Sequence, residues 1–338
     1  ETIMYFLSTF LSIAVLLALL VPGFILRKTH IVSDAAAKDL SGILIYIGLP
    51  AMIFYCMMSV DITLVTPVKV IVCFLLSIAV HVFGLIVVKI AFRRSEDAGR
   101  KAAASFSAVF SNCGFIGIPL TTIAVQYCDA FADTDSALSE AMLYVTIFNV
   151  VFNLLNWTLG RALFGSGEKK SVMLKKALLN PCTIATIVAL PFTLTGFSLL
   201  DPIVVGDFEI TQIASFITYL YNICVPVSMC VLGIRLADIK VVEMVRSKYM
   251  YAASAIKLVL IPAVFVGICL LLDLWLDIGA PLVITMTVMA ATPSATTALA
   301  FAERFDGDTV LAGECIMSST LLSIITVPLF LMLVVALV

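Results

Sequence analysis

The stretch Ser111–Leu120, SNCGFIGIPL, lies in the middle of an apolar segment that otherwise has the length of a membrane-spanning helix. Gly114, Gly117 and Pro119 fall within six residues of one another, and glycine and proline weaken or break a helix. Lipid offers no hydrogen-bond partner to the backbone groups that such a break releases. We therefore expect this part of the chain to lie against a water-filled cavity or another protein segment.

The composition is that of a polytopic membrane protein. Of 338 residues, 62% are hydrophobic and 12% are charged, whereas about a quarter of the residues of a soluble domain are charged. The net charge of -2, without a basic face, excludes nucleic acid as a partner, and the expected surroundings are a lipid bilayer. The nine cysteines lie mostly inside apolar runs without CxxC spacing, which favours hydrophobic packing over disulfides or a metal site.

Apolar runs of about 20 residues predict the membrane spans. Because the chain begins with Glu1 and not Met, we expect a trimmed start, and the first run is long enough to be a span instead of a cleaved signal. The fold class we expect is all-α integral membrane, with ten transmembrane helices. Their residues are 4–26, 39–60, 67–92, 102–126, 138–164, 176–198, 210–235, 248–275, 280–301 and 309–337.

The charges support this count and orient it. With the N-terminus outside, all Lys and Arg residues except Lys69 and Lys257 fall in or beside inner loops. The outer loops are acidic and contain, for example, Asp133, Asp201 and Asp277. By the positive-inside rule we expect both termini to lie outside. The location we expect is the plasma membrane, with the chain as a multi-pass protein.

Landmarks recur at a near-constant spacing in the two halves of the chain. Five spans fill residues 1–164 and five fill residues 176–338, with a cytoplasmic linker at 165–175 between them. Because five is odd, two copies of one unit would have opposite orientations. Such inverted repeats with interrupted helices are typical of secondary transporters. The landmarks, 174 to 176 residues apart, are Pro50 with Pro226, Pro119 with Pro293, His81 with Lys257, and Glu140 with Glu314.

A second break, AATPSATTA at Ala290–Ala298, lies in the ninth span at the position that matches the first. If broken helices 4 and 9 cross at their breaks, four half-helix ends meet near the midplane. The N-terminal ends carry N–H donors and partial positive charge, which suits a carboxylate. Kinks that serve only packing are the alternative, but two matching kinks among polar side chains favour a site. The hydroxyl residues there are Thr287, Thr292, Ser294, Thr296 and Thr297.

Several motifs, in the same order along the whole chain, resemble those of a known family. They are GLPAMIF (48–54), NCGFIGIPL (112–120), NPCTIATIVAL (180–190), VPVSMCVLGIRL (225–236) and ATPSATTALAFAERFDGD with SSTLLSIITVPL (291–329). The chain is similar in them to the auxin efflux carrier family, which includes plant PIN-FORMED carriers and bacterial malonate-type transporters.

This resemblance implies the ten-span inverted-repeat fold, transport of organic anions by an elevator-like motion, and a homodimer. It also implies that Asn112, Pro119 and Pro293 line the substrate site. The long cytoplasmic loop of many plant members is missing here, because residues 165–176 form a short linker. That difference puts auxin itself in doubt as the substrate.

The predicted substrate site consists of residues in the two breaks. They are Asn112, Gly114, Gly117, Pro119, Thr292, Pro293, Ser294, Thr296 and Thr297.

Ionisable residues inside spans are the candidates for coupling or for a counter-charge. They are His81, Lys257 and Glu314. For His81, polar packing is the alternative to a coupling role. We expect Lys257 to face an anion or an ion-pair partner. We expect Glu314 either to pair with Lys257 or to carry a coupling proton. Glu140, at the outer end of its span, is expected to be solvated.

Asparagines give two further expectations. Asn149, Asn153 and Asn156 recur on one face of the fifth span, which favours hydrogen bonds between helices, with a cavity-lining role as the alternative. Asn180 with Pro181 is expected to begin a helix.

The sequence thus predicts a secondary transporter of small organic anions, such as mono- or dicarboxylates, that works by alternating access. The alternatives are an anion channel and a sodium-coupled organic-acid symporter of related fold, and the coupling ion is left open between proton and sodium. With two histidines and no HExxH or GxGD motif, we expect no enzyme activity, cofactor or metal site. A structural or sensor role is favoured only if no anion binds.

Overall fold

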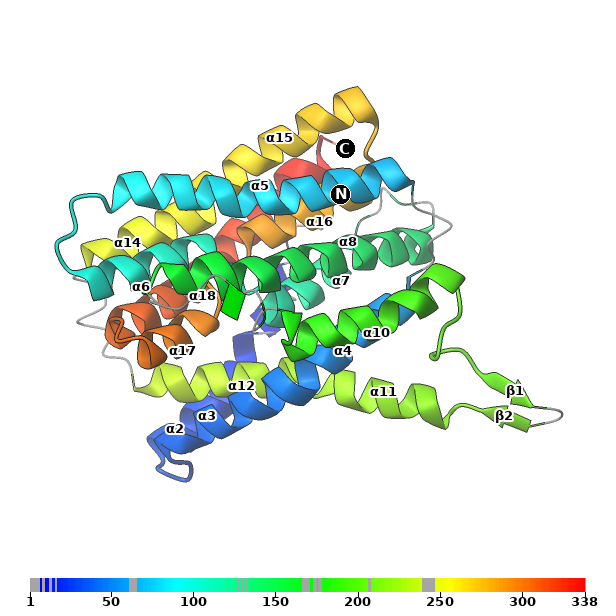
Figure 1. The fold of residues 1–338 in the computed structure, drawn as a ribbon, viewed down its shortest axis with the longest axis horizontal. Coiled ribbons are helices and arrows are strands. Elements are labelled where there is room, and N and C mark those ends of the chain that lie inside the picture. Colours follow the sequence, from blue (N-terminus) through cyan, green and yellow to red (C-terminus); the bar gives the residue numbers. More distant parts are fainter. Residues whose placement is uncertain are drawn as a thin grey trace.

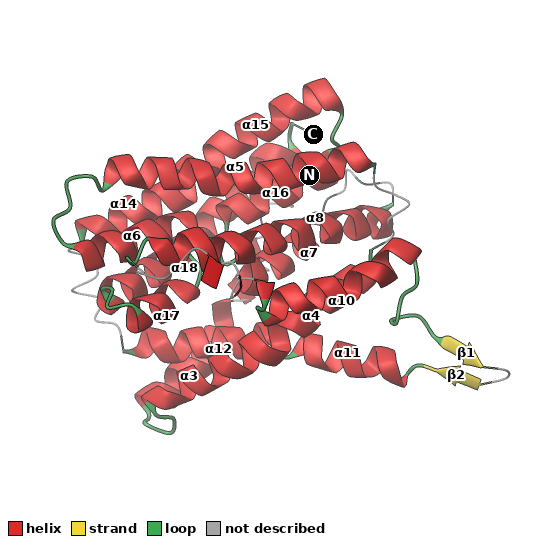
Figure 2. Cartoon of the chain, viewed as in Figure 1, coloured by secondary structure: helices red, strands yellow, loops and turns green. Residues whose placement is uncertain are grey.

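The computed structural model describes residues 17–60, 66–126, 133–165, 178–205, 208–238 and 247–337, together with isolated positions between 7 and 15, at 128 and 131, and between 171 and 175. The described chain is helical, as Figure 2 shows. One element departs from the expected all-α fold, a short antiparallel hairpin of β1 (Ile203–Val205) and β2 (Phe208–Ile210).

Six continuous helical stretches in the described residues are long and apolar enough to cross a membrane, and three apolar helices are shorter. Of the three shorter helices, one follows the first break, one lies in the predicted sixth span and one precedes the second break. Of the first predicted span, 4–26, the structure describes residues 17–26 and isolated positions before them. The six long stretches are Ala35–Met58, Pro67–Ala91, Thr134–Gly160, Gln212–Ala237, Lys248–Leu276 and Thr309–Val335; the short ones are Cys113–Gln126, Pro181–Thr195 and Ala280–Ala291.

A smaller group of helices occupies one side of the molecule, the lower side in Figure 1. In it α2 packs along α12, α3 along α12, and α4 along α10. We call these helices the small group. They are α2 (Leu20–Lys28), α3 (Asp34–Ile43), α4 (Leu49–Met58), α10 (Pro181–Thr195), α11 (Gln212–Asn222) and α12 (Cys224–Ala237), with the π-helical turn η1 (Leu44–Gly48) between α3 and α4.

Glycine allows α2 and α12 to touch backbone to backbone. A Cβ atom at Gly23 would overlap the carbonyl of Cys230, and one at Gly233 would overlap the carbonyl of Leu20. Membrane helices associate without a hydrophobic driving force, so such close contact between small residues is a main source of their attraction.

The remaining helices form what we call the large group. α16 is its centre, since every residue from Pro281 to Ala291 is buried, and it packs against α5, α7, α8, α15 and α18. The members are α5 (Pro67–Ala91), α6 (Ala98–Val109), α7 (Ile118–Gln126), α8 (Thr134–Leu155), α14 (Lys248–Ala255), α15 (Ile261–Leu276), α16 (Ala280–Ala291), α17 (Thr297–Arg304) and α18 (Thr309–Val335), with π-helical turns η3 (Cys113–Gly117), η4 (Asn156–Gly160) and η5 (Ile256–Leu260).

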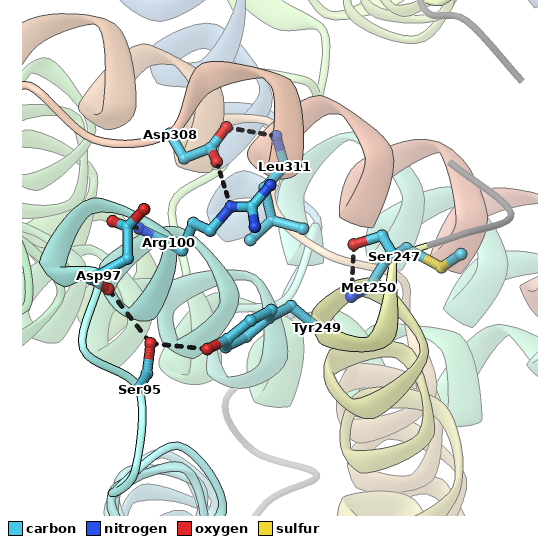
Figure 3. A network of polar contacts seen from close by, with 8 residues as sticks. All are labelled: Ser95, Asp97, Arg100, Ser247, Tyr249, Met250, Asp308 and Leu311. Carbon is cyan, nitrogen blue, oxygen red and sulfur yellow. Dashed lines mark hydrogen bonds and ion pairs between the residues drawn. The ribbon is translucent and has the colours of Figure 1, made fainter. Parts of the chain in front are cut away.

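Polar side chains tie together three helix starts of the large group (Figure 3). The caps of α6, α14 and α18 are Asp97, Ser247 and Asp308, and each accepts a backbone N–H from the first turn of its helix. Arg100 Nε donates to Asp308 Oδ2 at 3.1 Å, and this bond raises the pKa of the Arg100 guanidinium. The N-termini of α6, which leads into the first break, and of α18, which follows α17, are therefore held together at one end of the group.

Candidate functional site: the crossing of two broken helices

The two breaks meet and are joined by main-chain hydrogen bonds. The N–H of Asn112 donates to the carbonyl of Pro293 at 2.8 Å, and the N–H of Ala295 donates to the carbonyl of Phe110 at 2.8 Å. Ser111 and Ser294 thereby form an isolated antiparallel β-bridge. Backbone groups that leave one helix at its break find their partners in the other break, which is how the chain tolerates glycine and proline here.

Serine side chains brace this crossing. The Ser294 hydroxyl donates to the carbonyl of Ser107 at 2.7 Å, and the Ser294 N–H donates to Ser319 Oγ at 3.1 Å. All three serines are buried. The second break is thus fixed to α6 through Ser107 and to α18 through Ser319.

Lys257 reaches both breaks from η5. Its side chain is fully buried, and Nζ donates to Ser111 Oγ of the first break and to the carbonyl of Ala290, at 3.0 Å, in the last turn of α16. Among the described residues the structure shows no ion pair between Lys257 and Glu314. The lysine therefore lies inside the crossing.

His81, on α5, lies behind the crossing. Nδ1 donates to the carbonyl of Ser77 at 2.7 Å, and the buried ring packs against Phe110, Phe148 and Phe152. Its Nε2 atom has no hydrogen-bond partner among the described residues. Contact with Phe110 links the ring to the first break by packing.

Three neighbouring cavities lead away from the crossing. The crossing cavity, about 60 Å³, borders the middle cavity, about 70 Å³, and Asn112, Thr296 and Thr297 line both. The vestibule, about 440 Å³, shares Thr296 and Arg235 with the middle cavity. Together they form a series of spaces from the crossing to the end of the molecule that carries Asp238 and Glu303. This is the end that the charge distribution predicts to be cytoplasmic.

Two helix N-termini border the crossing cavity. Cys113 and Gly114 begin the helical stretch 113–126, and Thr297 begins α17; all three line this space. The first N–H groups of a helix lack partners within it and carry partial positive charge. The geometry therefore brings the backbone N–H donors of two helix N-termini to one cavity.

The predicted substrate residues divide into two sets. Asn112, Gly114, Thr296 and Thr297 line cavities. The others build or pack around the crossing: Pro293 and Ser294 pair with the first break, Thr292 caps α16, a Cβ at Gly117 would lie 2.9 Å from Met289 Cε, and Pro119 is the second residue of α7.

The part of the first break that contacts the second break is Phe110–Asn112, several residues before Pro119. Pro119, which the resemblance assigns to the substrate site, lies within the continuous helical stretch Cys113–Gln126, two residues after the π-helical turn η3.

Asparagine side chains supply much of the polar lining. Asn149, Asn153 and Asn156 all face the crossing cavity, and their amide hydrogen bonds run within α8, as from Asn149 Nδ2 to the carbonyl of Val145 at 2.9 Å. Between helices, the bonds seen among the described residues are that of Asn149 Oδ1, which accepts from Cys113 Sγ at 3.2 Å, and that of Asn156 Oδ1, which lies 3.5 Å from Thr297 Oγ1.

Asn180 both caps a helix and lines a cavity. Its Oδ1 accepts the N–H of Cys182 at 2.9 Å and so caps α10, which confirms the predicted helix start, and it also lines the crossing cavity. A cavity role could not be read from a cap motif.

Arg235 is the functional candidate that the sequence did not single out. It lines both the middle cavity and the vestibule, and Nη1 donates to Glu303 Oε1 at 3.0 Å. Because α12 belongs to the small group and α17 to the large group, this ion pair joins the two groups. The sequence signal for it is its place in the motif VPVSMCVLGIRL (225–236).

Two acidic residues show the limits of the repeat comparison. Glu314 is buried and lines the vestibule. Its repeat partner Glu140, expected to be solvated, is instead largely buried, pairs with Lys69 at 3.1 Å and accepts the Tyr144 hydroxyl. The expectation for Glu140 was wrong because Lys69, placed at the start of α5, reaches it across the helix pair.

Comparison with known proteins assigns the chain to a family. The family described as membrane transport protein matches residues 8–331. An uncharacterized transporter from Methanothermobacter thermautotrophicus is 27% identical over 325 residues, which cover 96% of either chain. Together with the motifs of both breaks, these matches show that the protein belongs to the membrane transport protein family, the family of the auxin efflux carriers.

Proposed function

We propose that the protein is a secondary carrier of small organic anions, with a carboxylate bound in the crossing cavity. The observation that carries this proposal is the meeting of two helix N-termini and Asn112 at one cavity. The Asn112 Nδ2 atom is buried and has no hydrogen-bond partner among the described residues. A buried amide donor without a partner costs free energy, and a ligand carboxylate would satisfy it.

Charge supports an anion. Lys257 lies directly behind Ser111, which lines the crossing cavity, and Arg235 lines the path toward it. Both cations favour an anion on that path by Coulomb attraction in a medium of low dielectric constant. The small volume of the crossing cavity favours the carboxylate group of a mono- or dicarboxylate as the part that enters it.

We further propose that the chain has ten spans in two inverted repeats and moves by an elevator-like mechanism. Support comes from symmetric packing: α2 of the first unit packs on α12 of the second, and α4 of the first packs on α10 of the second. The breaks both lie in the large group, while the cavities lie between it and the small group. A displacement of the large group against the small group would therefore carry the crossing with it.

By the same proposal the protein lies in the plasma membrane with both termini outside and works as a homodimer without a catalytic step. The vestibule then opens to the cytoplasm, which corresponds to an inward-facing state. An anion channel is the second candidate, because broken helices also line pores.

Flux in proteoliposomes tests the function. We expect saturable uptake of a labelled carboxylate that is accelerated by unlabelled carboxylate on the opposite side, since only a carrier exchanges in this way. Asn112→Ala should reduce carboxylate affinity by about tenfold, the cost of a lost charge-assisted hydrogen bond. Asn222→Ala, at the exposed end of α11, is the matched control. Unsaturable flux would favour the channel, and normal affinity of Asn112→Ala would move the site elsewhere.

A further inference from the structure

The end of α16 at the second break is a place where transporters commonly bind a cation. Half-helix C-termini carry partial negative charge, and the carbonyls released by a break coordinate sodium or protons in many carriers. The Val288 carbonyl keeps its helical bond, because it accepts the N–H of Thr292 at 2.9 Å, whereas the carbonyls of Met289 and Ala290 are released by the break. The Thr292 hydroxyl donates to the carbonyl of Met289 at 3.0 Å, and Lys257 Nζ donates to that of Ala290 at 3.0 Å.

The oxygens around the Lys257 ammonium are of the kind that hard cations take. One is a backbone carbonyl from the second break, and the other is the hydroxyl of Ser111 from the first. The ammonium thus bridges the two breaks, as a bound metal ion would. It is also fully buried, so its charge is screened little by solvent.

A sodium ion beside this ammonium would lack compensation. Among the described residues no carboxylate forms an ion pair with Lys257, and sodium there would place two positive charges side by side in the interior. Two like charges in a medium of low dielectric constant repel strongly. The lysine and a metal cation therefore exclude one another at this position.

We propose that Lys257 is a tethered cation that takes the place of a coupling sodium ion at the crossing, so that the carrier binds its organic anion without sodium. This inference rests on the proposed function and extends it to the choice of coupling ion. Ser111 contacts Lys257 on one side and lines the crossing cavity on the other. The positive charge that a co-bound ion supplies in a symporter is here part of the chain.

The test measures carboxylate binding to purified protein by thermal shift and calorimetry, in sodium, potassium and choline chloride at equal ionic strength. Wild type should bind equally in all three. Lys257→Ala removes the ammonium and leaves its two oxygen partners, so affinity in choline should fall about tenfold or more. Sodium or added propylammonium should restore part of it, because either can enter the space. Lys89→Ala, an exposed lysine on α5, controls for loss of charge.

The outcomes separate the two proposals. Sodium-dependent binding by wild type, or unchanged binding by Lys257→Ala in choline, would overturn the role of Lys257 and leave the anion carrier intact. No binding of any carboxylate by wild type would reject the proposed function and this inference with it. If Lys257→Ala does not fold, the wild-type comparison of the three cations and the variant Lys257→Arg, which keeps a tethered charge and should stay independent of sodium, decide the question.

Discussion

The N–H of Asn112 donates a 2.8 Å hydrogen bond to the carbonyl of Pro293, so the two broken helices are joined through their main chains. Both broken helices belong to the large group. The segments before and after the first break, α6 and α7, pack on α17 and α16 of the second, and α6 and α17 also pack on α18. The crossing therefore lies wholly within one helix group. Under the proposed mechanism, a substrate bound beside Asn112 would travel with that group and exchange its contacts with the small group.

The bracing of the crossing by Ser294 gives the first prediction. Ser294→Val removes the hydroxyl that donates a hydrogen bond to the carbonyl of Ser107, and that buried carbonyl loses this partner. We expect a loss of about 1–3 kcal/mol in the free energy of unfolding, measured by thermal or chemical unfolding in detergent. Ser215→Val, exposed on α11, should change little. Equal stability of both variants would show that the crossing does not need this bond.

Close contact between α2 and α12 gives the second prediction. Gly233→Val places a branched side chain against the carbonyl of Leu20, and the helices must separate. Overpacking of this kind costs about 1–3 kcal/mol or more. We expect a lower melting temperature and a smaller yield of monodisperse protein. Gly42→Ala, whose added Cβ meets no atom within 4 Å, is the control. A stable Gly233→Val variant would mean that the two helices are not in contact there.

The predicted orientation is tested by cysteine labelling in intact cells. Asp135→Cys, in the first turn of α8, should react with an impermeant maleimide from outside, and Glu96→Cys, before α6, should react only after permeabilisation. Of the nine native cysteines, eight are buried and Cys230 is partly buried, so wild type serves as the background control. Labelling of Glu96→Cys alone would reverse the orientation.

Features with a strong local signal could be predicted from the sequence. The spacing of proline and glycine located both breaks, and the Asn180–Pro181 pair located a helix start, because these residues act on their own backbone. Partners across helices could not be predicted. The bonds of Lys257 to Ser111 and Ala290 are one example, since the direction of a side chain depends on tertiary packing. The same holds for Lys69 with Glu140.

Arg235 was missed for a related reason. A positive charge near a span end usually lies in solvent, and this one does lie at the predicted inner end of its helix. It borders a cavity only because α17 begins at the second break and brings Glu303 to within 3.0 Å of it. The vestibule lies between the segments that contain Arg235 and Glu303, which are about 70 residues apart in the chain, and no local pattern in either segment predicts it.

The ion pair between Arg235 and Glu303 gives the last prediction. It joins the small group to the large group at the vestibule. Under the proposed function, an incoming carboxylate would compete with Glu303 for the guanidinium. Glu303→Gln should therefore raise carboxylate affinity, because the competitor is neutral. Arg235→Gln should lower it, by about threefold to tenfold for a partly solvated charge. Isothermal calorimetry at low and high salt measures both effects, and screening should shrink them at high salt.

Arg304→Gln, next to Glu303 but outside the cavity linings, is the matched control and should bind as wild type does. Transport rate separates a binding role from a role as a tie between the helix groups. If the pair restrains the large group, Glu303→Gln also speeds exchange at saturating carboxylate, since one fewer contact must break for the group to move. If Arg235→Gln and Glu303→Gln change affinity in the same direction, the hypothesis that Glu303 competes with the substrate is wrong, and the pair serves only to hold α12 to α17.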